Sequence, residues 1–452
     1  MPETAEQQSQ AHPHQAVYEA LHEGALTEVH RQLTEMHPAE IALLLESLPA
    51  DERNTVWELV HPEVAGDVLT HVGDNVRASL IRQMASHELV AATEGLDADD
   101  LADLLPEMPD QVIQRVLTSM DEQNRQRLEA VLPYPEDTAG GLMNVDTVTV
   151  RADITLDVVL RYLRRRGELP ETTDKLIVID RDGYYQGLLG LPELLLNNPD
   201  CSVAEVMKRD VEPIAADTAA GEVAKLFEQR DLVTAPVVNE EGRLLGRITI
   251  DDVVDVIRDE ADHSFMSMAG LTEEEDLFAP VLNSTRRRAV WLGVNLVTAF
   301  LASWVIGLFE GTIEQLVALA VLMPIVASMG GIAGSQTLTL VIRGMALGQV
   351  SPKNAWRLLA RELSVGILNG VIWAAVIAVV AYFWFDNPWL GVIIAAAIVI
   401  NLVVAALAGA TLPLILRWLG ADPALAGTVV LTTITDVVGF MTFLGLAAVF
   451  LV

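Results

Sequence analysis

The C-terminal stretch of the chain reads PALAGTVVLTTITDVVGFMTFLGLAAVFLV, residues 423–452. It is long and apolar enough to cross a bilayer as one helix, yet it contains an ionisable side chain, Asp436. A charge at this depth costs about 2.5–3.5 kcal/mol on insertion scales and usually faces a pathway or a partner. Thr428, Thr432 and Asp436 recur at every fourth position, so they share one helix face, and Thr435 adds a neighbouring hydroxyl. Such a stripe suits a partly hydrated cation; the alternative is a hydrogen bond between helices in the bundle core.

Four further apolar stretches precede this one, and each is long enough to cross a bilayer. The five predicted spans cover residues 289–309, 313–347, 363–385, 389–418 and 424–452. Basic residues lie before the first span, between the second and third, and at the end of the fourth, whereas the alternate loops have none. By the positive-inside rule, this pattern predicts a cytoplasmic N-terminal half and a C-terminus outside.

Charge divides the chain into two halves. The sequence holds 62 acidic and 29 basic residues, and all but six of the acids and five of the bases precede Ala289. An acidic soluble half repels nucleic acid and attracts cations; adaptation of the surface to salt explains the same excess equally well. The one cysteine, Cys201, allows no internal disulfide and fits a reducing cytosol.

The soluble half begins with a helical pattern. After a tail over 1–16 that we expect to be disordered, apolar residues recur at three-to-four spacing, with regular breaks at proline, aspartate and glycine. Short helices with such breaks predict a helical superhelix over 17–132.

A duplication follows this helical region. Three positions of the first copy return 59 residues later in the second: Asp180, Gly183 and Gly187 correspond to Asn239, Gly242 and Gly246. Each copy reads strand, helix, strand, turn, strand, helix. The repeat resembles a tandem pair of CBS domains, over 133–200 and 201–258, a module that often binds adenine nucleotides. Thr249 and Asp252 match that family's ribose contact, but the first copy lacks the hydroxyl, so ATP binding and a purely structural pair both stay open.

An acidic segment, 259–285, connects the soluble half to the first span and is predicted to be a connecting helix. Its pattern begins earlier, and the carboxylates that we expect to meet cations there include Asp255, Asp259 and Glu260. The sequence contains no Walker-type phosphate loop, zinc-ligand spacing or serine-hydrolase elbow. The scattered histidines are interpreted as surface or capping residues. We therefore expect a protein that is not an enzyme.

Four motifs carry a wider resemblance: EDTAGGLM at 136–143, MPIVASMGGIAGSQ at 323–336, RELSVGILNG at 361–370 and TTITDVVG at 432–439. Together with the domain order, they resemble the MgtE family of magnesium transporters over nearly the whole chain. The fold expected is that of a multidomain membrane protein. It combines an all-α superhelical N-terminal domain, an α/β tandem CBS pair and an α-helical five-span transmembrane domain over 286–452.

The resemblance implies a homodimeric, Mg²⁺-selective channel in the bacterial inner membrane, surrounded by lipid and without a nucleic-acid partner. Its pore would lie at the dimer interface, where paired Asp436 carboxylates would hold hydrated Mg²⁺, an ion that gives up its water reluctantly. Cytosolic Mg²⁺ would bridge acids of the soluble half and close the pore. Seven positions match the family's sensing acids: Asp67, Asp99, Asp103, Glu241, Asp251, Asp276 and Asp422.

The chain also departs from the family pattern. Ile332 stands where the family usually has Asn, Thr428 and Val429 replace a polar pair that contains proline, and Asn239 replaces a sensing acid. Two alternatives therefore stay open. One is a coupled divalent-cation exchanger, whose flux would depend on a Na⁺ or H⁺ gradient. The other is a non-conducting membrane sensor, which would bind Mg²⁺ or nucleotide and pass no ion.

Overall fold

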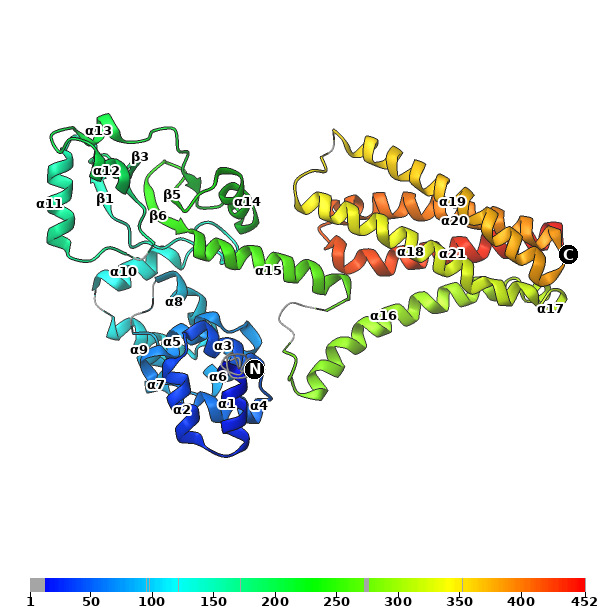
Figure 1. Cartoon of the computed structure of the whole chain (residues 1–452), viewed down its shortest axis with the longest axis horizontal. Coiled ribbons are helices and arrows are strands. Elements are labelled where there is room, and N and C mark those ends of the chain that lie inside the picture. The colour runs from blue at the N-terminus through cyan, green and yellow to red at the C-terminus, as the bar shows by residue number, and fades with distance from the viewer. Residues whose placement is uncertain are drawn as a thin grey trace, which may run out of the picture. The chain divides into compact units, whose positions relative to one another are not determined.

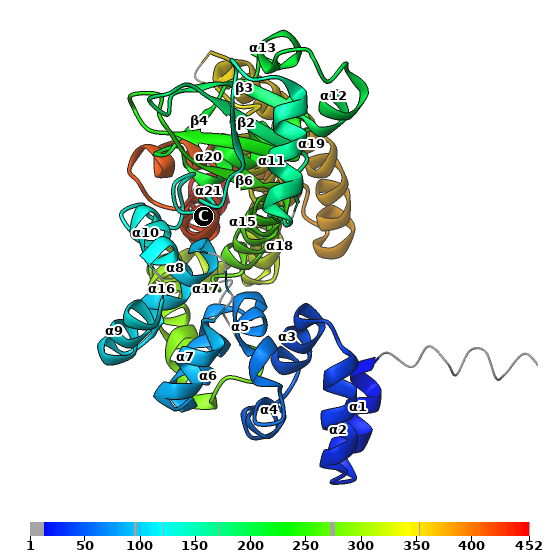
Figure 2. The ribbon, with the colours of Figure 1, turned by 90° about the vertical axis from the view of Figure 1, so that its left-hand side faces the viewer.

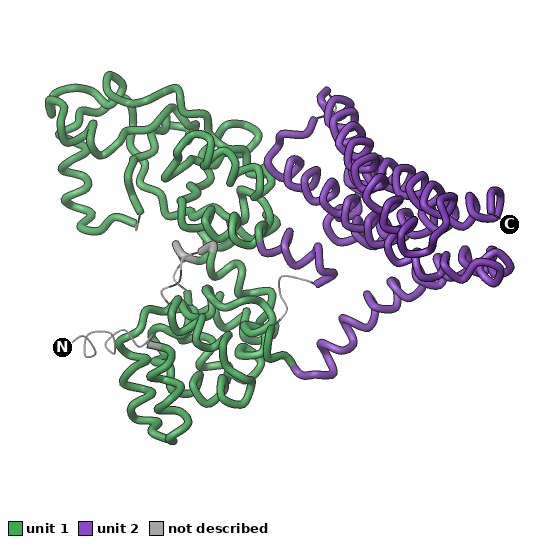
Figure 3. Tube along the Cα trace, turned by 45° about the vertical axis from the view of Figure 1, so that its right-hand side comes forward, with its two compact units in different colours: residues 1–261, 274–279 green, residues 262–273, 280–452 purple. Residues whose placement is uncertain are grey.

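The computed structural model describes residues 13–94, 96, 98–120, 122–170, 172–271, 276–351 and 353–451. The chain divides into two compact units, shown in Figure 3. Unit 1 comprises residues 1–261 and 274–279, and unit 2 comprises residues 262–273 and 280–452.

The first part of unit 1 is entirely helical where the structure describes it (Figures 1 and 2). Its elements are α1 (Pro13–His22), α2 (Leu26–Glu35), α3 (Pro38–Glu46), α4 (Ala50–Trp57), α5 (Pro62–His71), α6 (Asp74–Gln83), α7 (Ser86–Ala92), α8 (Ala98–Leu104), the 3₁₀ turn η2 (Leu105–Glu107), α9 (Asp110–Ser119) and α10 (Glu122–Val131). A continuous apolar core runs through them from Val17 to Leu128. The prediction of a domain built from short helices is confirmed.

Two histidines define where helices of this domain begin. Each imidazole accepts a hydrogen bond from the backbone N–H two residues later in the chain. His37 accepts from Ala39 and His61 accepts from Glu63, both at 3.3 Å. A proline follows each histidine at the first helical position, where its missing N–H costs nothing. For these two histidines the predicted capping role is confirmed.

Two three-stranded sheets of the same topology form the rest of unit 1. They are built from β1 (Thr149–Arg151), β2 (Lys175–Ile179) and β3 (Tyr185–Gly190), and from β4 (Ile214–Ala215), β5 (Thr234–Val238) and β6 (Leu244–Thr249). In each sheet the first strand is parallel to the middle strand and the third is antiparallel to it. Val178 pairs with Gly187, and Val237 pairs with Gly246, with an irregularity directly after each pair. The predicted duplication therefore extends to the register of the strands.

Five helices accompany these sheets: α11 (Leu156–Arg166), α12 (Leu191–Leu196), α13 (Val203–Val206), α14 (Ala220–Arg230) and α15 (Ile250–Met268). The segment that precedes the first sheet joins the second one instead. Asn144 exchanges backbone hydrogen bonds of 2.8 and 2.9 Å with Arg247 of β6, and Ala139 and Met143 belong to the second core. The EDTAGGLM motif at 136–143 thus serves the second copy.

Unit 2 contains the membrane helices. They are α16 (Val281–Gly307), the short α17 (Glu310–Gln315), α18 (Ala318–Ala346), α19 (Ala355–Phe385), α20 (Pro388–Trp418) and α21 (Pro423–Phe450). All but α17 are long and apolar enough to cross a membrane. Helix α20 is the most enclosed of the five and α16 the least, and α20 contacts α18, α19 and α21. The predicted five-span architecture is confirmed.

Candidate ion path and cation-sensing acids

The last span begins at a capping residue, Asp422. Its carboxylate accepts the backbone N–H groups of Ala424 and Leu425 at 2.8 and 3.3 Å, an arrangement that stabilises a helix start and complements its dipole. Nε2 of His263, near the end of α15, lies 3.5 Å from the same carboxylate. This predicted sensing acid therefore already has a structural role, with a histidine beside it.

The predicted stripe lies farther along α21. Asp436 is half-buried, and within the described part of the chain its carboxylate makes no hydrogen bond or ion pair. The hydroxyl of Thr432 donates to the carbonyl of Thr428 at 2.9 Å, and that of Thr435 donates to the carbonyl of Thr432 at 3.0 Å. Thr435 is 0% exposed, so it faces the bundle core, while the other three stay partly accessible.

An open groove of about 590 Å³ lies between α18 and α21. Thr432 contributes to it from α21, and its polar lining from α18 includes Ser335, Gln336, Thr339 and Arg343. The stripe of Asp436 thus shares a helix face with one wall of a groove whose lining combines hydroxyls and an amide with the guanidinium of Arg343 and the apolar side chain of Leu340. Oxygen ligands of this kind suit a hard, partly hydrated cation.

Ile332 also lines this groove, with 57% of its surface exposed. An apolar side chain offers no oxygen to an ion. The departure from the family pattern noted in the sequence therefore falls on the groove wall itself.

In unit 1, acids gather around Asp103 of α8. Burial, together with the charges of Glu136, Asp100 and Asp74, raises the pKa of Asp103 to about 7, against the opposing effect of Arg77. The side chain of Asp103 nonetheless remains exposed, whereas that of Asp252, another acid with a strongly raised pKa, is half-buried. Solvent therefore screens the charge of Asp103 more than that of Asp252. Crowded carboxylates that resist ionisation are a setting in which a divalent cation gains most.

Thr249 and Asp252 form the start of α15. The Thr249 hydroxyl and backbone N–H donate to the same Asp252 oxygen at 3.1 and 3.4 Å, and the bond from the backbone N–H is one half of a capping box. Burial, then the charge of Asp251, raises the pKa of Asp252 to about 7, although its bonds from Thr249 act the other way. The hydroxyl and carboxylate expected at a ribose are thus bonded to each other in this structure.

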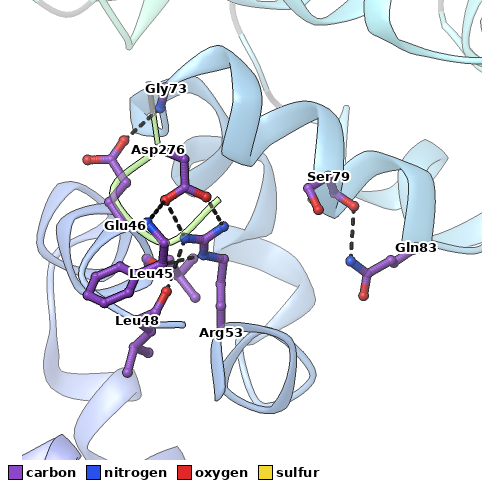
Figure 4. A network of polar contacts seen from close by, with 9 residues as sticks. Leu45, Glu46, Leu48, Arg53, Gly73, Ser79, Gln83 and Asp276 are labelled. Atoms are coloured by element: carbon purple, nitrogen blue, oxygen red, sulfur yellow. Dashed lines mark hydrogen bonds and ion pairs between the residues drawn. The ribbon is translucent and has the colours of Figure 1, made fainter. Parts of the chain in front are cut away.

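Asp276 has an arginine partner (Figure 4). Its two carboxylate oxygens accept hydrogen bonds from Nη1 and Nη2 of Arg53 in α4, at 2.9 and 3.0 Å. The pair is buried, with 3% of the Arg53 side chain and 9% of the Asp276 side chain exposed. Arg53 also donates to the carbonyls of Leu45 and Leu48. The guanidinium already neutralises the carboxylate that we had expected to be available to a cation.

The other predicted sensing acids lie on the surface. They are Asp67, Glu241, Asp251, Asp255, Asp259 and Glu260. Arg258 lies 3.8 Å from Asp255 and 3.5 Å from Asp259. Asp99 lies outside the residues whose side chains the structure describes. Among the described residues of this single chain, no three acids, histidines or cysteines are grouped to hold a metal.

Comparison with known proteins identifies the family. A family model described as a divalent cation transporter matches residues 323–446, one for the MgtE intracellular N domain matches 36–137, and CBS models match 139–197 and 203–259. A magnesium transporter MgtE of Thermus thermophilus is 34% identical over 442 residues, 96% of this chain and 98% of that protein. The chain belongs to the MgtE family of magnesium transporters.

A second sequence relative agrees with this membership. MgtE of Bacillus subtilis is 28% identical over 431 residues, covering 95% of this chain and 96% of that protein. A solved structure described as the cytosolic domain of the Mg²⁺ channel MgtE in complex with ATP is 36% identical. It covers 54% of this chain and 99% of its own, with a TM-score of 0.49.

Some polar residues of this MgtE chain were not predicted as site residues. Glu362 of α19 is 5% exposed. Its carboxylate accepts a hydrogen bond from the hydroxyl of Thr337 at 3.3 Å and another from Nη1 of Arg361 at 3.2 Å. Asn401 of α20 is 1% exposed and donates to the carbonyl of Val326. For Asn401, a polar side chain inside an apolar span was the available signal, as it was for Asp436. Glu362 precedes the predicted span 363–385, so no such signal was available for it.

Proposed function

We propose that this MgtE protein passes Mg²⁺ through a homodimeric path in which Asp436 is the ion-binding carboxylate. The single observation that carries the proposal is a half-buried carboxylate in a membrane span that has no partner within the described residues. Such a group is costly unless a cation or water compensates it. Its helix face also bears Thr428 and Thr432, and Thr432 lines the groove beside α18.

The open groove supports the dimeric part of the proposal. In this proposal one chain supplies ligands to one side of the ion only, through Asp436 of α21 and through the hydroxyls of Ser335, Thr339 and Thr432 that line the groove. A second copy that faces the first would enclose the ion with two carboxylates and two sets of hydroxyls. Hydrated Mg²⁺ keeps several waters and needs only one or two carboxylates, so such a path selects through the water shell.

Gating by cytosolic Mg²⁺ is supported by the electrostatics of unit 1. Burial first, and then the negative charges of neighbouring acids, raise the pKa values of Asp103 and Asp252, so these carboxylates are costly to ionise and repel the acids around them. A divalent cation relieves this repulsion and releases protons as it binds. Loss of the ion would restore the repulsion between these acids, and in this proposal that repulsion releases the soluble half from the arrangement that closes the pore. Asp99, Glu241, Asp251 and the acids of α15 belong to the same proposal.

Two further parts of the proposal concern ATP and orientation. Thr249 and Asp252 would have to exchange their mutual hydrogen bond for contacts to a ribose, so any ATP binding competes with the capping of α15.

The basic residues Arg343, Lys353 and Arg357 lie in and beside the connection between α18 and α19. This placement favours a cytoplasmic N-terminal half and an external C-terminus in the bacterial inner membrane.

The test is Mg²⁺ flux into liposomes that contain the purified full chain. Asp436→Asn keeps the size and polarity of the side chain but removes its charge. We expect flux to fall by at least about tenfold, equivalent to 1.4 kcal/mol in the barrier. Asp386→Asn is the matched control, because Asp386 ends α19 in a left-handed conformation that asparagine also tolerates.

Wild-type flux from Asp436→Asn would overturn the ion-path assignment. Mg²⁺ binding without any flux in the wild type would favour a membrane sensor, a reading to which Ile332 on the groove wall lends some support.

A further inference from the structure

The enclosed helix α20 carries a buried amide at its centre. Asn401 is 1% exposed. Its Nδ2 donates to the backbone carbonyl of Val326 in α18 at 2.9 Å. Its Oδ1 is buried and has no hydrogen-bond partner among the described residues. The donor bond defines which way the amide points, because a flipped amide would place two oxygens against each other.

Two glycines provide the space that this amide occupies. A methyl group at Gly439 of α21 would lie 2.8 Å from Nδ2 of Asn401, and one at Gly330 of α18 would overlap the same atom. Three helices therefore meet at one side chain. It projects from α20 into a slot whose walls are the bare backbones of α18 and α21.

Stability alone does not explain an amide at this position. The residues around it in α20, such as Ile398, Leu402 and Ala405, are buried and apolar. An unpaired buried acceptor carries the desolvation cost of a hydrogen bond that is not made, and an apolar side chain of the same shape avoids that cost. The amide does, however, have a directed bond, which an apolar side chain lacks.

We propose that Asn401 is a positioning residue for Asp436, which rests on the proposed role of Asp436 as the ion-binding carboxylate. Gly439 lies three residues beyond Asp436, about 4.5 Å along the helix axis. The amide contacts α21 at that glycine and hydrogen-bonds α18 four residues before Gly330. Because α18 and α21 are the two walls of the groove, one side chain behind the groove defines how far apart the walls stand and at what depth the carboxylate lies.

Asn401→Leu separates this role from packing. Leucine is similar in shape, lacks the donor and removes the unpaired acceptor. We expect the thermal stability of the full chain to stay equal or rise. The Mg²⁺ concentration for half-maximal flux should nevertheless rise about tenfold, or 1.4 kcal/mol, and discrimination against Ca²⁺ should weaken. A residue that only fills space would not separate the two readouts.

Gly439→Ala tests the same contact from α21, with Gly445→Ala in that helix as its control. A methyl at Gly445 would meet only ring atoms of Phe309, at 3.8 Å. We expect Gly439→Ala to shift half-saturation as Asn401→Leu does and Gly445→Ala to leave it unchanged. Adding Asn401→Ala to Gly439→Ala removes the steric clash but also the donor, so the double variant should regain thermal stability relative to Gly439→Ala while its half-saturation stays shifted.

The outcomes distinguish the two proposals. If Asp436→Asn conducts like wild type, the ion-path assignment fails, and the positioning role fails with it. If Asp436→Asn is inactive while Asn401→Leu and Gly439→Ala both retain wild-type half-saturation and selectivity, only the positioning role is overturned. Should Gly439→Ala fail to fold, the result for Asn401→Leu decides.

Discussion

At the scale of single residues, the protonation of Asp252 links stability to pH. Burial and the neighbouring Asp251 raise its pKa from the usual 3.8 to about 7, so the folded state holds the proton more tightly than the unfolded state. Its contribution to stability is therefore complete below about pH 4 and is lost as pH rises through 7. We predict that thermal unfolding of unit 1, followed in the full chain without Mg²⁺, moves to lower temperature across this range.

Asp252→Asn should flatten this pH dependence, because the amide does not titrate. Asp217→Asn, at an exposed carboxylate after β4, is the control and should follow wild type. A pH dependence that Asp252→Asn leaves unchanged would contradict the account of this group.

Protons and Mg²⁺ should also compete for the same acids. Carboxylates must be deprotonated to bind a cation, and Asp103 and Asp252 both titrate near neutrality. We predict that the Mg²⁺ concentration that half-protects unit 1 from proteolysis rises as the pH falls from about 8 to about 6. An equal requirement at both pH values would show that these acids do not bind the protecting ion.

Among single residues, Asp436 could be predicted from the sequence as a site residue, but Asn401 could not. An acid in an apolar span is conspicuous by its charge. The sequence displays Asn401 as well, but its meaning depends on Gly330 and Gly439, which lie in two other helices. Hydropathy and periodicity are properties of one segment, so they do not reveal a slot made by three.

At the scale of elements, the Arg53–Asp276 pair ties the segment before α16 to α4 (Figure 4). Removing one partner leaves a buried charge uncompensated, which typically costs about 3–5 kcal/mol. We predict that Arg53→Ala strongly increases hydrogen exchange in residues 276–280 and in the turn that follows α3. Arg31→Ala, which breaks the exposed pairs with Glu28 and Glu35, should change exchange little.

If exchange at 276–280 stays at the wild-type level in Arg53→Ala, this pair does not hold the segment. The same variant bears on sensing. A cation can use Asp276 only after Arg53 withdraws, so Mg²⁺ should restore protection in Arg53→Ala more effectively than it increases protection in wild type.

The elements themselves were largely predictable. Apolar length indicated the five spans, and the 59-residue offset indicated two copies of one sheet, down to the equivalent glycines in each register. Two features were not predictable. Asn144 pairs with Arg247 rather than with the first sheet, and Arg53 pairs with a residue 223 positions away. Both depend on tertiary proximity, which no local pattern records.

At the scale of the whole molecule, the distribution of basic residues predicts a topology that labelling can test. Cys201 is the sole cysteine, so Cys201→Ser gives a background without thiols. In that background, Leu451→Cys should react with a membrane-impermeant maleimide added outside intact cells, and Lys353→Cys should react only after the cells are opened. The reverse pattern would contradict an external C-terminus.

Mg²⁺ current across a patch that contains the full chain, with unit 1 facing the bath, tests conduction and gating together. We expect a passive current that needs no Na⁺ or H⁺ gradient, falls as bath Mg²⁺ rises and is absent in Asp436→Asn. A flux that requires such a gradient would indicate a coupled exchanger. A current that persists in Asp436→Asn, or is indifferent to bath Mg²⁺, would contradict an Mg²⁺-gated path through this carboxylate.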